Sequence, residues 1–168
     1  MGLFDKVRSS LSRGEDDNAP RPERLNTLPE PEAPVGDLPL KPEIQRIGES
    51  ERERIAAGIA ALEEDGVDID DLASLGAGYD RALARWIDGP EGDHGLIVDR
   101  IAMGVGEHLA RHTDLAWEIV TDVFGTDLAV TAGDFVVVPN NLVAVRWMRR
   151  ETGWVVPVVG HLVTLRNR

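Results

Sequence analysis

Two histidines on a predicted helix are the side chains of this sequence best spaced for metal chemistry. His108 and His112 are four residues apart, so on a helix they share one face and can both reach a single Zn²⁺ ion. Glu107 precedes both histidines and projects about 100° away from His108, so it does not occupy the general-base position between two histidine ligands. Histidines near a helix C-terminus are also stabilised by the helix dipole. We therefore predict no metal site, and keep the two histidines as weak metal candidates and Glu107 as a candidate binding residue.

Aromatic and basic side chains gather near the end of the sequence. Trp147 and Trp154 flank a predicted turn at 149–153 that carries two arginines. Tryptophan and arginine are enriched in the energetic hot spots of protein interfaces. The simpler interpretation is that both indoles pack in the core and that the arginines are solvated. The candidate binding surface consists of Arg146, Trp147, Arg149, Arg150 and Trp154.

The sequence contains no recognisable catalytic motif. It has no G-x-S-x-G, no P-loop and no G-x-G-x-x-G after a strand. Asp68-x-Asp70 lacks the following acidic position and the glycine of an EF-hand loop. Acidic residues are abundant, so a catalytic carboxylate pair is not excluded. We predict a non-enzymatic protein without a cofactor, and the alternative is a small metal- or carboxylate-dependent enzyme.

Composition excludes several classes of protein. The chain has 168 residues, 18 of them basic and 30 acidic, for a formal net charge of −12. This acidity argues against nucleic acid as a partner, because nucleic-acid binding needs a basic surface. Without cysteine there is no disulfide, thiol catalyst or cysteine-based metal site. No apolar run approaches the ~20 residues that span a bilayer and no signal peptide is recognisable, so we expect a cytoplasmic location.

Proline divides the chain into three predicted parts. Seven of the ten prolines lie between Pro20 and Pro42, where they prevent a helix or a central strand. Residues 14–42 are therefore predicted to be a Pro-rich linker. Before it, residues 1–13 place their apolar side chains on one helical face, which predicts a short amphipathic helix. Residues 43–168 are predicted to form a single domain.

Hydrophobic periodicity predicts helices first and strands afterwards in that domain. The predicted elements are helices from a Ser50–Glu53 capping box to Gly66, from Asp70 or Asp71 to Trp86 or Ile87, and from Leu96 to His112, strands at 117–122, 127–131, 135–138 and 142–148, and a short helix at 154–166. A helix also fits 142–148, and an edge strand also fits 154–166. This order is typical of the α+β class, with helices packed on one face of an antiparallel sheet of about three to four strands.

Residues 101–151 resemble a bacterial family known as domain of unknown function 3806. The resemblance is carried by Gly104-x-Gly106-Glu107 on a helix and by Trp117 at the start of a strand. It continues with Asp122-x-x-Gly125 in a turn and with Pro139 before a predicted strand that ends in basic residues. The resemblance implies an α+β module and supplies no catalytic residues. The chain has 16 arginines and 2 lysines, a composition typical of a high-GC bacterium.

We predict from these features an interaction module with an N-terminal docking helix on a flexible tether. A protein partner, and weak contact of residues 1–13 with an anionic membrane surface, both fit this layout. An acidic, immunity-like protein that opposes a basic partner is a further alternative. The net charges are −2 for residues 1–42, −10 for 43–99 and 0 for 100–168. The acidity therefore belongs to the first two helices of the domain and their loops, and the oligomeric state stays open.

Overall fold

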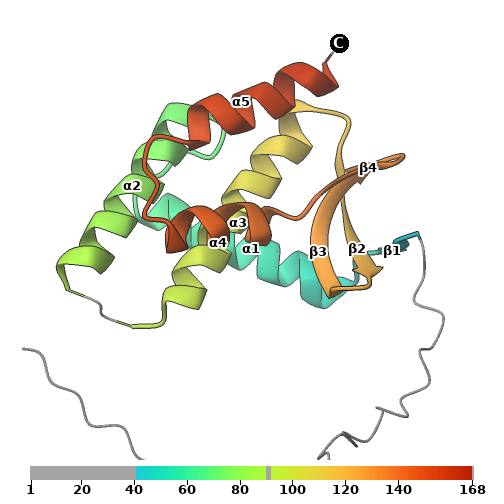
Figure 1. The fold of residues 1–168 in the computed structure, drawn as a ribbon, viewed down its shortest axis with the longest axis horizontal. Helices are drawn as coiled ribbons and strands as arrows, with labels where there is room; N and C mark the ends of the chain where they lie inside the picture. Colours follow the sequence, from blue (N-terminus) through green and yellow to red (C-terminus); the bar gives the residue numbers. More distant parts are fainter. Residues whose placement is uncertain (1–40, 90–91, 168) are drawn as a thin grey trace, which may run out of the picture. The chain divides into compact units, whose positions relative to one another are not determined.

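Residues 41–89 and 92–167 are described by the computed structural model of this chain. They form five helices and one four-stranded antiparallel sheet, so the α+β class is confirmed (Figure 1). The predicted helix at 1–13 and nearly all of the predicted linker at 14–42 lie outside the described residues. Within the described ranges, no helix combines the length and the apolarity needed to cross a bilayer.

The first three helices begin where acidic side chains can accept hydrogen bonds from their N-terminal amides. Helix α2 (Leu72–Asp88) is capped by Asp71, which accepts from the Ala73 N–H at 2.9 Å. Helix α3 (His94–His112) is capped in the same way by Asp93. Helix α1 (Glu49–Glu64) differs from the prediction, because its N-cap is Gly48. The Gly48 N–H donates to the Glu51 carboxylate at 2.7 Å, so the predicted Ser50–Glu53 capping box is wrong.

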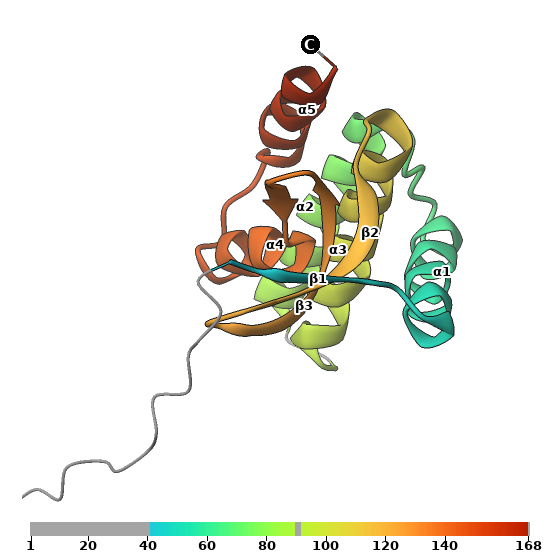
Figure 2. The same cartoon turned by 90° about the vertical axis from the view of Figure 1, so that its right-hand side faces the viewer.

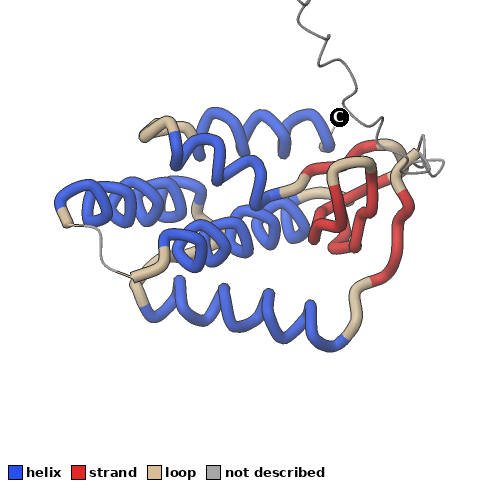
Figure 3. The backbone as a smooth tube through the Cα atoms, turned by 60° about the horizontal axis from the view of Figure 1, so that its bottom comes forward, coloured by secondary structure: helices blue, strands red, loops and turns tan. Residues whose placement is uncertain are grey.

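The strands lie in the order β1-β2-β3-β4, in which β2, β3 and β4 form a meander and β1 joins the edge from before the first helix. The strands are β1 (Glu43–Arg46), β2 (Ala116–Asp122), β3 (Gly125–Ala132) and β4 (Phe135–Val137). Cα partners such as Ile44 with Val120 and Trp117 with Val130 set the register. Strand β1 was not predicted, because it is a short, exposed edge strand with one apolar residue and no alternation. Figure 3 shows the strands gathered at one end of the helical part.

The segment that follows the sheet corrects one prediction. Residues 142–148, predicted as a strand, belong to helix α4 (Pro139–Met148). Pro139 occupies the first turn, where its fixed φ favours a helix and its missing N–H costs nothing. Val143 and Trp147 are buried four residues apart, which is the helical period. The predicted C-terminal helix is confirmed as α5 (Val155–Arg166).

Helix α3 is the centre of the core and touches every layer of the fold. It packs against α1, α2, α4 and α5 and against β2 and β3. Helices α1, α2 and α5 pack chiefly on other helices, and the sheet is contacted mainly by α3 and α4. The predicted packing of the helices on one face of the sheet is therefore only partly realised. Figure 2 shows α1 on one side of α3 and α4 on the other.

Two glycines on α3 permit this close packing. A Cβ at Gly104 would lie 2.5 Å from Leu62 Cδ1, and a Cβ at Gly106 would lie 2.1 Å from Trp117 Cη2. Both glycines therefore admit large side chains from neighbouring elements.

Candidate functional site

A pocket of about 680 Å³ lies between the C-terminal ends of α1 and α2 and the N-terminal half of α3. Both α1 and α2 pack on α3 but make little contact with each other, so a space is left between them. Its floor is apolar and includes the buried residues Leu62, Val67 and Ile101. A volume of this size is typical of ligand sites.

Small residues on α2 keep the pocket open. Gly78 and Ala82 are four residues apart and both line it, so they occupy one face of the helix. A Cβ at Gly78 would lie 2.6 Å from Val67 Cγ2, so the glycine lets the connection after α1 approach α2. A larger side chain at position 82 would project into the space that the pocket occupies.

Charged side chains of both signs surround the apolar floor. Arg81 and Arg85 extend from α2, four residues apart, and Arg100 extends from α3. Arg100 Nη1 lies 3.5 Å from Asp65 Oδ2. No ion pair joins Arg81 or Arg85 to another side chain in the described ranges. With Asp65 and Asp88, the lining carries three guanidinium groups and two carboxylates, and so has a net positive charge.

Trp86 adds an aromatic wall to the pocket. Its ring is partly buried, 5.5 Å from the His94 ring and 6.4 Å from the Trp147 ring, measured between centroids. An indole partly open to a pocket can stack on an apolar or aromatic group. The pocket therefore combines an apolar floor, an aromatic wall and guanidinium groups, which together suit an apolar group next to a negative charge.

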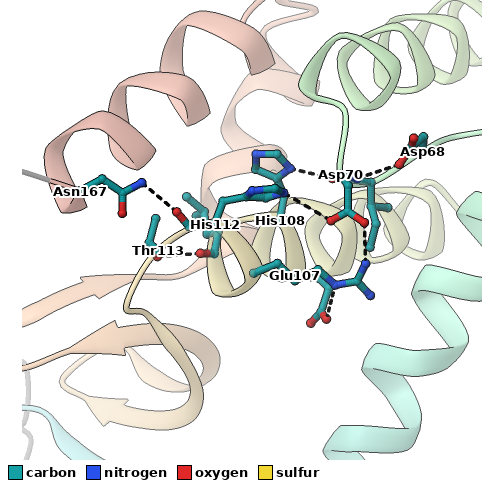
Figure 4. Close-up of polar contacts among 10 residues, drawn as sticks. Asp68, Asp70, Glu107, His108, His112, Thr113 and Asn167 are labelled. Atoms are coloured by element: carbon teal, nitrogen blue, oxygen red, sulfur yellow. Dashed lines mark hydrogen bonds and ion pairs between the residues drawn. The ribbon is translucent and has the colours of Figure 1, made fainter.

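The two weak metal candidates lie elsewhere, at the C-terminal end of α3. Their ring centroids are 4.3 Å apart and the ring planes are tilted by 33°, and His108 Nδ1 is hydrogen bonded to the Ile69 carbonyl at 2.6 Å (Figure 4). Burial lowers the pKa of His108, which favours the neutral imidazole. His112 Nε2 lies 3.3 Å from Asp70 Oδ1. Within the described residues, no three His, Asp or Glu side chains are placed to hold one metal ion.

Glu107 takes part in a network that joins α3 to the sheet and to the α1–α2 connection (Figure 4). It accepts from Trp117 Nε1 at 2.9 Å and from Arg111 Nε at 2.9 Å. Arg111 Nη1 also donates to Asp70 at 2.9 Å. The Glu107 carboxylate is therefore occupied by donors of this chain. The motif residues Gly106, Glu107 and Trp117, which carry part of the family resemblance, meet at this contact.

The predicted aromatic and basic surface is divided by the fold. Trp147 and Trp154 are 4% and 2% exposed, and both pack edge-on against Tyr79. Arg146 lies over the Trp154 ring, 4.6 Å from its centroid. Arg149 and Arg150 are exposed. Both indoles thus belong to the core and are not presented to a partner, which leaves the two exposed arginines as the accessible part of this surface.

Sequence analysis missed the pocket, although one signal for it was present. Arg81, Arg85 and the small residues Gly78 and Ala82 recur at a spacing of four, which predicts a basic helix face with little bulk between the charges. The contributions of Asp65 and Arg100 depend on how α1 and α3 pack, and no local pattern reveals that.

Comparisons of the chain with protein-family models, with curated proteins and with solved structures find no match. The resemblance of residues 101–151 to the uncharacterised bacterial family stays a prediction.

Proposed function

We propose that this protein is a non-enzymatic binding module whose helical pocket takes an apolar group that carries or adjoins a negative charge. The pocket between α1, α2 and α3 supports this proposal, because its floor is apolar and its lining holds Arg81, Arg85 and Arg100. The apolar floor favours a hydrophobic group by removing it from water. Guanidinium groups favour a carboxylate, sulfonate or phosphate through charge-assisted hydrogen bonds.

The chemistry of the lining favours binding over catalysis. The described residues that line the pocket include no hydroxyl, thiol or imidazole side chain, the groups that most often act as nucleophile or general base. The two carboxylates, Asp65 and Asp88, come from the C-terminal ends of different helices. Of the two, Asp65 is paired with Arg100.

The proposal can be tested with anilinonaphthalene sulfonate, a fluorescent probe that joins an aromatic body to one negative charge. We expect saturable binding of about one probe per native chain. Ala82→Leu should weaken it by narrowing the pocket, whereas Ala84→Leu, an exposed position on the same helix that does not line the pocket, should leave it intact. Replacing Arg81 and Arg85 together by alanine should weaken binding about 10-fold, and Arg149→Ala should not.

Two results would contradict the pocket as a binding site. One is equal probe binding by the Ala82→Leu and Ala84→Leu variants, and the other is no binding by the native chain. Circular dichroism and a cooperative unfolding transition must show that each variant is folded, because partly unfolded chains also bind this probe.

We propose in addition that residues 1–13 are a docking helix on a tether formed by residues 14–42, which lie almost wholly outside the described part. Deletion of residues 1–40 should leave a folded domain, since β1 begins at Glu43, and should abolish binding to vesicles that contain anionic lipid. Co-sedimentation with such vesicles tests this proposal. Equal binding by the full chain and the truncated chain would remove residues 1–13 from the proposal.

A further inference from the structure

The turn between β2 and β3 presents two apolar side chains to solvent. Asp122 pairs with Gly125, so Val123 and Phe124 form a two-residue loop, and they are 47% and 91% exposed. Such loops usually carry glycine, asparagine or aspartate. The Phe124 backbone N–H donates to Asp122 Oδ1 at 2.7 Å. The phenyl ring is thus presented by a hydrogen-bonded turn.

The hairpin that carries this ring is acidic. Residues 116–132 contain three acidic side chains, Glu118, Asp122 and Asp127, and no basic one. Asp127 lies opposite Val120, and Asp122 is two residues beyond Val120, so both carboxylates project from the same face of the hairpin on either side of the turn. The tip of the hairpin therefore joins a large apolar group to two negative charges.

We propose that the hairpin tip of one copy of this chain binds in the helical pocket of a second copy. Phe124 would enter the apolar floor beside Trp86, and the two aspartates would face Arg81 and Arg85. The chemistry of the tip matches the chemistry of the pocket in both respects, apolar against apolar and negative against positive. This inference rests on the proposed function, because it uses the same pocket and names its partner.

The fold prevents a chain from filling its own pocket. The hairpin belongs to the sheet, which lies at the opposite side of the molecule from the C-terminal end of α2 (Figure 1). The contact must therefore join two copies through different surfaces. Such a head-to-tail interface builds rings or open chains of subunits and does not give a closed twofold dimer.

Sedimentation velocity of the full chain at increasing concentration tests the proposal. Native protein should form species larger than a monomer. Phe124→Ser should weaken association about 10- to 100-fold, and because Phe124 is exposed the fold should not change. Met148→Ser removes another exposed apolar side chain, 82% exposed, and should have no effect. Replacing Arg81 and Arg85 by glutamate should abolish association, whereas Arg149→Glu should not.

Mixing two inactive variants gives the sharpest result. The Phe124→Ser chain keeps its pocket and the Arg81→Glu, Arg85→Glu chain keeps its hairpin tip. At a concentration below the dissociation constant of the Phe124→Ser chain, each should be monomeric alone, and an equimolar mixture should form a 1:1 dimer that grows no further. Pairing of tip with tip, or of pocket with pocket, does not predict that recovery.

Three outcomes would overturn the inference. They are native protein that stays monomeric, association that Phe124→Ser leaves unchanged, and no dimer in the mixture. If the native protein stays monomeric but still binds the sulfonate probe in the pocket, the proposed function stands and only the second copy is wrong as partner. If the probe does not bind either, both proposals fail together.

Discussion

Gly106 offers a direct test of how α3 packs against the sheet. In the interior of an isolated helix, alanine is more favourable than glycine by about 1 kcal/mol, so propensity alone predicts that Gly106→Ala stabilises the protein. The surroundings of Gly106 predict the opposite. An alanine Cβ would lie 2.1 Å from Trp117 Cη2, 2.4 Å from Trp117 Cζ2 and 2.9 Å from Pro139 Cγ, whereas carbon atoms normally pack about 3.5–4.0 Å apart.

The Trp117 ring cannot move aside cheaply. Its Nε1 is held by the Glu107 carboxylate at 2.9 Å, and a hydrogen bond to a charged group contributes about 1.5–3 kcal/mol. Overpacking of a core typically costs about 1–3 kcal/mol. Set against the gain in propensity, these costs predict that Gly106→Ala lowers the free energy of unfolding by about 1.5–5 kcal/mol.

Urea unfolding, followed by far-ultraviolet circular dichroism, measures this change. Gly160→Ala on α5 is the matched control, because there the nearest atom to the new Cβ would be Leu72 Cδ1 at 3.6 Å, an ordinary contact. That variant should be unchanged or more stable by up to about 1 kcal/mol. Gly106→Ala that is as stable as the native protein would refute the packing of Trp117 on α3.

A double substitution locates the cause of the destabilisation. Trp117→Phe removes the outer ring that collides with the new methyl group, so it should recover part of the loss caused by Gly106→Ala. The coupling free energy from the double-mutant cycle should be at least about 1 kcal/mol. Strictly additive effects would show that the methyl group disturbs something else.

Three further predictions concern other parts of the fold. Because burial lowers the pKa of His108, this histidine is protonated in the unfolded chain at a higher pH than in the folded chain, beginning near pH 6.5. The urea midpoint should therefore decrease when the pH is lowered from 7.5 to 5.5. This pH dependence should be smaller in His108→Gln and unchanged in His161→Gln. Asp71→Ala removes the N-cap of α2 and should cost about 0.5–2 kcal/mol in urea unfolding. Val143 is fully buried and Val145 is 45% exposed, so Val143→Ser should lower the thermal midpoint by several degrees and Val145→Ser should barely change it. In a strand the two side chains would share one face, and both substitutions would be destabilising.

Elements with strong local signals could be predicted from the sequence. Asp71, one of the two residues predicted to begin the second helix, caps α2 in the structure. Helix α3 begins at His94, two residues before the predicted start at Leu96, and is capped by Asp93. The turn from Asp122 to Gly125 falls between two alternating runs and forms the predicted hairpin. In these places the side chain that determines the structure lies within a few residues of the backbone that it orders.

Predictions failed where the deciding contact is distant in sequence. In residues 142–148, Val143, Val145 and Trp147 alternate as in a strand, but burial of Val143 and Trp147 against the helical core selects the helix. The local sequence around the two tryptophans of the candidate binding surface is compatible with either the core or an interface. Their place in the core is decided by Tyr79, which lies more than sixty residues earlier in the sequence and packs against both. The pocket also needs three helices to be placed before its arginines meet.

The net charge of the pocket lining is opposite in sign to that of residues 43–99. Residues 43–99 carry a net charge of −10 and contain five arginines, two of which, Arg81 and Arg85, line the pocket. The total charge therefore repels an anion at long range, while the pocket attracts it over a few ångströms. Exposed charges more than about 10 Å apart are screened at 0.1 M salt, but an anion inside the pocket would be in direct contact with the guanidinium groups. Screening thus weakens the long-range repulsion at physiological ionic strength, so an acidic partner, including a second acidic copy of the same chain, is compatible with an acidic protein.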